Sequence, residues 1–123
     1  MEGSGCGVSE GGVTLEVGED AFYNSGQSPN RHLTELVAAH FFEYQNVYGN
    51  EDLSFLDCCC STGIRGLRLA KRLSSRVSHV SFLDYDPAMI SLARTNASAP
   101  KNSFMREGIK THFHCEECGD FLC

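Results

Sequence analysis

The sequence predicts an α/β fold in which helices cover a parallel sheet. Two observations predict it. Residues 53–58 form a short apolar run that ends near Asp57, and a small-residue turn and a helix pattern follow directly. Residues 77–83 form a second, alternating run, which ends on Asp84 before another helix pattern. Strands and helices that alternate in this way are typical of sheets that hold a ligand at the carboxyl ends of their strands.

Length and composition narrow the class of protein. A chain of 123 residues with 41% hydrophobic residues has the size and apolar content of one small domain. Its formal net charge of -6 argues against a surface that is basic throughout, so a nucleic acid would need a local patch or a region outside this sequence. We find no apolar run of about eighteen residues and no secretory signal. We therefore expect no membrane span, an intracellular location (nuclear, nucleolar or cytoplasmic) and seven reduced cysteines.

The first twenty residues differ in composition from the rest. Residues 1–12 contain five glycines together with Ser and Glu, so we expect a flexible leader there. Residues 13–17 alternate between apolar and polar side chains and predict a short strand. We accordingly divide the chain into a leader over 1–20 and a domain over 21–123.

A helix is expected from Asn30, as N-cap, to about Gln45. It is predicted by apolar residues at helical spacing, namely Leu33, Leu36, Val37, Phe41 and Tyr44. Arg31 falls in its first turn, where the helix dipole disfavours a cation. A positive charge held there predicts an anionic partner; the alternative is a solvated arginine.

The turn after the first main strand excludes two common chemistries. Cys60 and Ser61 stand where the early glycines of the dinucleotide fingerprint would be, and the turn lacks the lysine of a P-loop. Hydride transfer and phosphoryl transfer are therefore disfavoured. Two roles remain open for Asp57: it accepts backbone N–H groups of the turn, or it binds the charged amino group of a ligand.

Three consecutive cysteines, Cys58, Cys59 and Cys60, end this strand. Neighbouring residues of an extended segment point to opposite faces, so these thiols do not converge on one tetrahedral metal. We expect small thiols that pack beneath a helix.

The helix over 61–73 should bury the stripe Ile64, Leu67, Ala70 and Leu73. Another face carries four arginines three and four residues apart, which are Arg65, Arg68, Arg72 and Arg76. Arg65 lies beside the turn. We expect the later three to stay solvated, with contact to RNA phosphate as the alternative.

Asp84 ends the second strand, somewhat more than twenty residues after Gly63. An acid in this position is placed to accept hydrogen bonds from ribose hydroxyls. Capping of the next helix is better assigned to Asp86, because Asp86-Pro87 is a typical helix opening.

The carboxyl-terminal stretch offers an alternative site. Residues 111–115 predict a third strand, and His112, His114, Cys115 and Cys118 are four potential zinc ligands. They are crowded into seven residues, without the long loop that zinc modules normally close. We keep a zinc module, and a Cys115–Cys118 redox dithiol, as alternative hypotheses.

Three stretches resemble the S-adenosylmethionine-dependent tRNA (guanine-N2)-dimethyltransferases and their diverged animal paralogue. Residues 57–68, DCCCSTGIRGLR, are similar to the family's D-x-x-x-x-T-G-x-R-x-x-R loop. Residues 22–24, FYN, with Asn30-Arg31 are similar to its F-Y-N-P and N-R-D motifs. Residues 82–84, FLD, are similar to its second acidic motif, and the three occur in the family's order.

The resemblance implies a Rossmann-like class I methyltransferase, present as the N-terminal half of the doubly wound sheet, with S-adenosyl-L-methionine as cofactor. It implies cofactor contacts by Arg31 (to the carboxylate), Asp57, Gly63, Arg65, Asp84 (to the ribose) and Asp120 (to the adenine amino group). Three positions depart from the family pattern, and the first is Ser25, which stands in place of the proline of F-Y-N-P. His32 replaces an acid, which removes one expected partner of Arg31, and Phe121 follows Asp120 where the family usually has alanine.

The resemblance also implies tRNA as substrate. The family's catalytic Asp-Pro-Phe loop and its basic RNA-binding region would lie after Cys123, so we expect no catalytic residue in this chain. We therefore expect a fragment, a truncated isoform or an incomplete gene model that is inactive alone. We expect such a piece to expose an open strand edge and apolar surface, and therefore either to be marginally stable or to depend on a partner for folding. The alternatives are a non-catalytic interaction remnant of the enzyme and the zinc module.

Overall fold

The computed structural model describes residues 6–18, 23–45, 52–105 and 108–122. Phe22, the first residue of the FYN stretch, lies outside them. The elements in chain order are β1 (Cys6–Glu10), β2 (Val13–Val17), η1 (Ser25–Gln27), α1 (Ser28–Gln45), β3 (Leu53–Cys58), α2 (Ile64–Arg72), β4 (Val77–Asp84), α3 (Pro87–Ser98), η3 (Pro100–Met105), β5 (Lys110–Cys115) and α4 (Cys118–Leu122).

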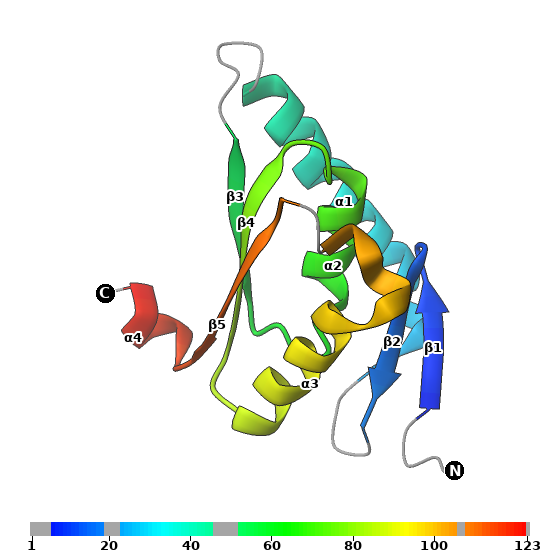
Figure 1. Ribbon diagram of the computed structural model, residues 1–123, viewed down its shortest axis with the longest axis vertical. Coiled ribbons are helices and arrows are strands. Elements are labelled where there is room, and N and C mark those ends of the chain that lie inside the picture. Colours follow the sequence, from blue (N-terminus) through cyan, green and yellow to red (C-terminus); the bar gives the residue numbers. More distant parts are fainter. Residues whose placement is uncertain (1–5, 19–22, 46–51, 106–107, 123) are drawn as a thin grey trace.

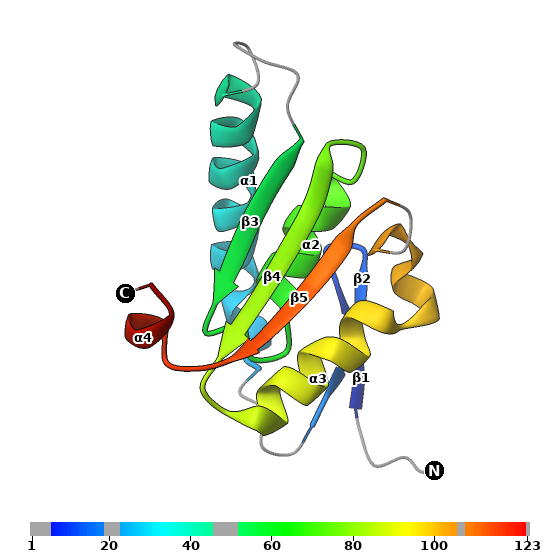
Figure 2. The ribbon, with the colours of Figure 1, turned by 60° about the vertical axis from the view of Figure 1, so that its left-hand side comes forward.

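The main sheet has the strand order β3-β4-β5, and both strand pairs are parallel. Figure 1 shows α1, α2 and α3 on one side of this sheet and α4 on the other. In Figure 2 the three strands run side by side, with α1 and α2 behind them. The predicted α/β fold with a parallel sheet is therefore confirmed, and the model is consistent with part of a Rossmann-like methyltransferase.

The core lies between this sheet and the helices. The predicted stripe of α2 is buried, with Leu67 and Ala70 fully enclosed. On the sheet, the rings of Phe82 and Phe113 stack across β4 and β5 with their centroids 5.3 Å apart. The stacked rings extend the apolar face of the sheet from β4 to β5, where α3 packs against it.

A hairpin of β1 and β2 packs against α2 and α3 on the side away from the sheet (Figure 1). The predicted strand over 13–17 is confirmed, but a flexible leader is wrong for residues 6–12. Gly11 and Gly12 both have positive φ, 57° and 79°, as a two-residue hairpin turn requires. The glycines therefore form a tight turn, and Val13 and Leu15 of β2 are fully buried.

Helix α1 begins at Ser28, two residues before the expected N-cap Asn30. Asn24 instead caps the preceding turn η1 by accepting a hydrogen bond from the N–H of Gly26 at 2.9 Å. The apolar residues that predicted α1 are exposed, between 42% and 61%. Polar Arg31 and Glu35 of the same helix are buried instead, both at 7% exposure. No helix in the described part of the chain has the length and apolarity that a bilayer crossing requires.

Candidate functional site

The turn between β3 and α2 has an unusual backbone. Cys59, Ser61 and Gly63 have φ angles of 55°, 50° and 87°. Glycine adopts such angles readily, but for Cys and Ser they are strained and persist only when the surroundings hold them. The turn therefore depends on groups outside it.

Asp84, at the end of β4, is one of these groups. Its Oδ2 accepts a hydrogen bond from the N–H of Ser61, and its Oδ1 accepts one from the N–H of Asp86, both at 3.0 Å. Asp86 in turn caps α3 through the N–H of Ala88, which confirms its predicted role. A carboxylate has about four acceptor positions, so Asp84 keeps about two for a ligand.

Asp57, at the end of β3, is buried and accepts a hydrogen bond from the N–H of Gly66 at 2.9 Å. Its first predicted role, as acceptor of backbone N–H groups, is therefore present, although the donor lies in α2. Burial raises the pKa of this carboxyl to about 6, against the opposing effects of Gly66 and Arg65. A Cβ atom on Gly66 would lie only 2.8 Å from the ring of Phe82, so this glycine lets α2 approach the sheet closely.

Arg31 is held by Glu10 of β1. Its Nε and Nη2 donate to the two carboxylate oxygens at 2.7 and 2.6 Å, and Nη2 also donates to the carbonyl of Asn24 at 2.9 Å. The alternative of a solvated arginine is therefore wrong, since Arg31 is only 7% exposed. Arg31 thus has an acidic partner in Glu10, although residue 32 is a histidine. The Arg31 guanidinium holds the pKa of Glu10 down at about 2, with smaller contributions from Tyr23 and Arg68.

The same carboxylate binds a second arginine. Arg68 donates to Glu10 at 2.7 Å and to Glu35 at 2.8 Å, and its side chain is 4% exposed. Arg72 also pairs with Glu35. The prediction that Arg68 stays solvated is therefore wrong, because acids from β1 and α1 cover this face of α2. These ion pairs tie the hairpin and both helices together next to Arg31.

Four of the six predicted site residues line two cavities. A cavity of about 260 Å³ between α1, α2 and β3 is lined by Arg31, Asp57 and Arg65, whose guanidinium also donates to Thr34 Oγ1 at 2.8 Å. A second cavity of about 170 Å³ lies at the ends of β4 and β5 and is lined by Asp84. Gly63 is the N-cap of α2 and lines neither of these two cavities.

Asp120 is exposed in the first turn of α4 and lines neither of these two cavities. The structure thus brings Arg31, Asp57 and Arg65 together and places Asp84 across the turn from them. It does not join Asp120 to either group.

Among the described residues, cysteines and histidines meet in pairs and not in larger groups: Cys58 is hydrogen-bonded to Cys118, and His79 contacts His112. Cys60 is packed, and burial raises the pKa of its thiol far above the usual value, but Cys58 and Cys59 are exposed, so the packing prediction is wrong for those two. His112 lies 3.0 Å from His79, and His114 contacts the ring of Phe121. Within the described ranges, no three His, Cys, Asp or Glu side chains are grouped so that they could hold a metal ion.

Sequence reasoning missed two residues that support the candidate site: Glu10, which holds Arg31, and Asn96, which holds the turn. Asn96 is 1% exposed and donates to the carbonyl of Thr62 at 2.9 Å. An amide among the buried Ala93 and Ala97 of α3 was the available signal, since a buried amide needs partners. Glu10 gave no comparable signal.

Comparison with known proteins identifies the family of this chain. The family model of N2,N2-dimethylguanosine tRNA methyltransferases matches residues 5–116. The tRNA (guanine(26)-N(2))-dimethyltransferase of Halobacterium salinarum is 34% identical over 99 residues, which are 72% of this chain and 24% of that protein. The enzyme of the same name from Methanococcus aeolicus is 30% identical over 102 residues, which are 73% of this chain and 26% of that protein.

The chain thus spans about a quarter of the length of the curated relatives it matches. The matched residues 5–116 include the hairpin, the turn, Asp57 and Asp84, and they make up most of the 123 residues. On this evidence the chain belongs to the N2,N2-dimethylguanosine tRNA methyltransferase family.

Proposed function

We propose that this chain supplies the S-adenosylmethionine-binding part of a tRNA (guanine-N2)-dimethyltransferase. One observation carries the proposal. Asp57 and Asp84 end adjacent parallel strands; Asp84 accepts a hydrogen bond from Ser61 in the turn between β3 and α2, and Asp57 accepts one from Gly66 near the start of α2. A turn and a helix start fixed in this way at the carboxyl ends of parallel strands form the usual ligand site of such sheets.

The residues present fit this cofactor in charge and in hydrogen bonding. Three carboxylates line the cavity at the ends of β4 and β5, those of Asp84, Glu116 and Glu117. Such a lining suits a ligand that carries hydroxyl donors and a positive charge, as S-adenosylmethionine does in its ribose and its sulfonium. Arg31 has five N–H donors, and its three hydrogen bonds to described residues use three of them; we propose the other two, on Nη1, as donors to the cofactor's carboxylate.

The roles proposed for the chain's own residues follow from these contacts. Asp84 accepts hydrogen bonds from the ribose hydroxyls of the cofactor while it also holds the N–H of Ser61. Arg31 binds the carboxylate of the cofactor, and Glu10 orients the Arg31 guanidinium. Asp57 fixes the start of α2, and Arg65 and Gly63 border the ligand. The proposed contact of Asp120 with the adenine amino group rests on the family resemblance alone, because Asp120 lines neither of the two cavities. When bound, the cofactor would supply an electrophilic methyl group for transfer to the exocyclic nitrogen of guanosine.

Calorimetric titration of the purified chain with S-adenosylmethionine tests the proposal. We expect saturable binding that Asp84→Asn weakens at least tenfold, because one acceptor oxygen is lost. Asp86→Asn is the matched control, since Asn caps a helix as well as Asp. Circular dichroism establishes that each variant is folded. A folded wild-type chain that releases no binding heat at millimolar cofactor would overturn the proposal.

We further propose that the residues that position the guanine amine and the tRNA lie outside this sequence, so the chain alone transfers no methyl group. The test is incubation of the purified chain with a guanosine-containing tRNA and radiolabelled S-adenosylmethionine. Label in the tRNA as N2-methylguanosine or N2,N2-dimethylguanosine would contradict this second proposal while leaving the first intact.

A further inference from the structure

Two asparagines close the free edge of β2. Asn102 Oδ1 accepts from the N–H of Thr14 at 3.0 Å, and its Nδ2 donates to the carbonyl of the same residue at 2.7 Å. Asn96 makes the same pair of bonds with Glu16, at 2.7 and 3.0 Å. Residues 14 and 16 present their backbone groups to the same edge, so the two amides replace a neighbouring strand.

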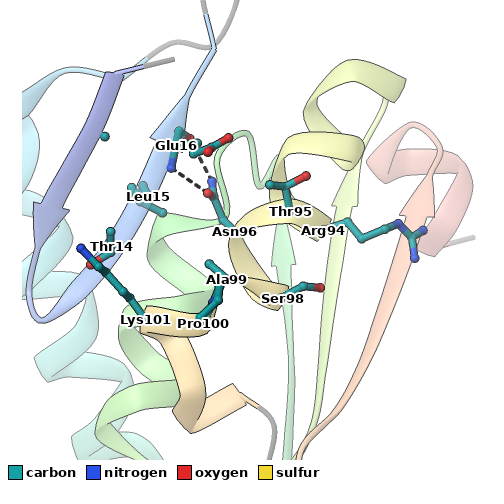
Figure 3. A pocket seen from close by; sticks show the side chains of 11 residues that line it. Thr14, Leu15, Glu16, Arg94, Thr95, Asn96, Ser98, Ala99, Pro100 and Lys101 are labelled. Atoms are coloured by element: carbon teal, nitrogen blue, oxygen red, sulfur yellow. Dashed lines mark hydrogen bonds between the residues drawn. The ribbon is translucent and has the colours of Figure 1, made fainter. Parts of the chain in front are cut away.

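Figure 3 shows Asn96 reaching from α3 to Glu16 on β2, beside a cavity of about 750 Å³ that both residues line. Both asparagines are buried, Asn96 at 1% and Asn102 at 0% exposure. Their polar atoms are therefore shielded from water, and each lost bond would leave a buried group without a partner.

The two amides differ in their third hydrogen bond. Asn96 Nδ2 also donates to the carbonyl of Thr62 at 2.9 Å, inside the turn between β3 and α2. Asn102 Nδ2 donates instead to the carbonyl of Asn96 at 2.8 Å, at the end of α3. Only the first of these bonds reaches the candidate site.

The turn is thus held from two sides. Asp84 binds the N–H of Ser61, and Asn96 binds the carbonyl of Thr62, the next residue along the chain. Ser61 and Gly63 on either side of Thr62 both have positive φ, so this backbone needs outside support. Thr62 is 1% exposed, which leaves no water to replace the amide.

We propose that Asn96 is a positioning residue of the candidate cofactor site: through the Thr62 carbonyl it holds the backbone of residues 59–63 in its ligand-binding shape. The hairpin also helps to hold the turn, because the side-chain amide of Asn96 is hydrogen-bonded to the backbone of Glu16 in β2. The identity of the ligand rests on the proposed function, whereas the effect on the turn does not.

Asn96→Asp tests this in the full chain. The carboxylate keeps the size of the side chain and an acceptor for Glu16 N–H, but it replaces the donor nitrogen with an oxygen that faces two carbonyls. Asn102→Asp is the matched control. It removes the equivalent donor to a backbone carbonyl of β2, and Asn102 has no hydrogen bond to the turn. Hydrogen–deuterium exchange of residues 60–64 is the first readout, with exchange in β4 as the reference for global unfolding. Calorimetric titration with S-adenosylmethionine is the second.

We expect both variants to be destabilised and only Asn96→Asp to raise exchange in the turn, at least tenfold relative to β4. We also expect it to weaken S-adenosylmethionine binding at least tenfold more than Asn102→Asp does. Equal exchange of the turn in the two variants would overturn the proposal. A wild-type chain that binds no S-adenosylmethionine would overturn the proposed function alone, because the exchange result still decides the role of Asn96. If the aspartate variants do not fold, Asn96→Ser and Asn102→Ser make the same comparison, with the same deciding outcomes.

Discussion

Arg31 and Glu10 form a bidentate ion pair, in which Nε and Nη2 donate to the two carboxylate oxygens at 2.7 and 2.6 Å. Both side chains are buried, at 7% and 5% exposure. The pair joins β1 to the first turn of α1, and Arg68 of α2 binds the same carboxylate. The amino-terminal hairpin is therefore part of the structure that supports the candidate site.

The first prediction concerns the charge of Glu10. Glu10→Gln should lower the free energy of unfolding by roughly 3 kcal/mol, because loss of one partner leaves buried guanidinium groups without a counter-charge. Urea unfolding followed by circular dichroism measures this. Glu16→Gln is the control, since the Glu16 side chain is exposed on the same hairpin.

The difference in free energy of unfolding between the wild type and Glu10→Gln depends on pH through the pKa of Glu10, which is lowered from 4.5 to about 2. The stabilisation is present above pH 4.5 and is lost as the pH falls toward 2, where the folded state also takes up the proton. The wild type and Glu10→Gln should therefore converge in stability in acid. A difference that stays constant from pH 7 to pH 2.5 would contradict the buried ion pair.

The second prediction concerns Asp57, whose pKa is raised from 3.8 to about 6. Between pH 6 and pH 4 the folded state binds a proton that the unfolded state does not. The stability that this proton confers is present below pH 4 and is lost as the pH rises through 6. Asp57→Asn keeps an oxygen for the N–H of Gly66 without the buried charge, so it should be more stable than the wild type at pH 7, on the order of 2 kcal/mol.

Denaturant unfolding at pH 4, 5, 6 and 7 measures this effect. The advantage of Asp57→Asn should shrink as the pH falls and vanish near pH 4. An equal advantage at all four values would mean that the charge of Asp57 is not the cause.

The parts of this fold that the sequence predicted depend on local patterns. The buried stripe of α2 and the strands before Asp57 and Asp84 follow from side-chain periodicity over a few residues. A carboxylate at the end of such a strand lies at the edge of the parallel sheet once the strands pair. Asp57 and Asp84 could therefore be placed without knowledge of any distant contact.

The parts that it did not predict depend on distant contacts. Glu10 meets Arg31 and Arg68 across 21 and 58 residues of sequence, and charged residues that pair in this way leave no periodic signal. The glycine-rich composition also led to a wrong prediction: Gly11 and Gly12 indicated a flexible leader, but they form a hairpin turn. The apolar stripe of α1 correctly predicted a helix. It did not show which face of the helix is buried, because ion pairs made by distant residues bury the polar face.

The third prediction concerns that stripe. Leu33, Val37 and Phe41 lie four residues apart on α1, are 59%, 61% and 55% exposed, and border a cavity of about 530 Å³. Exposed apolar surface of this kind promotes association, so we expect the chain to self-associate as its concentration rises. Val37→Lys with Phe41→Lys should shift it toward the monomer in sedimentation velocity. Glu43→Lys is the control, because it changes the net charge by the same amount and leaves the stripe intact.

The last prediction concerns the close approach of α2 to the sheet at Gly66. A Cβ there would lie 2.8 Å from Phe82 Cε1 and 3.0 Å from Asp57 Oδ2. Alanine normally stabilises a helix by about 1 kcal/mol relative to glycine, but overpacking of this kind costs about 1–3 kcal/mol. We expect Gly66→Ala to be destabilised on balance.

Gly119→Ala in α4 is the matched control, because no atom lies within 4 Å of its added Cβ. It should leave the thermal unfolding midpoint unchanged or raise it slightly, whereas Gly66→Ala should lower it. If Gly66→Ala were as stable as Gly119→Ala, α2 could not sit as close to Phe82 as the structure places it. The hydrogen bond from the Gly66 N–H to Asp57 depends on the same approach, so this result would also remove the support for Asp57 as the group that fixes the start of α2.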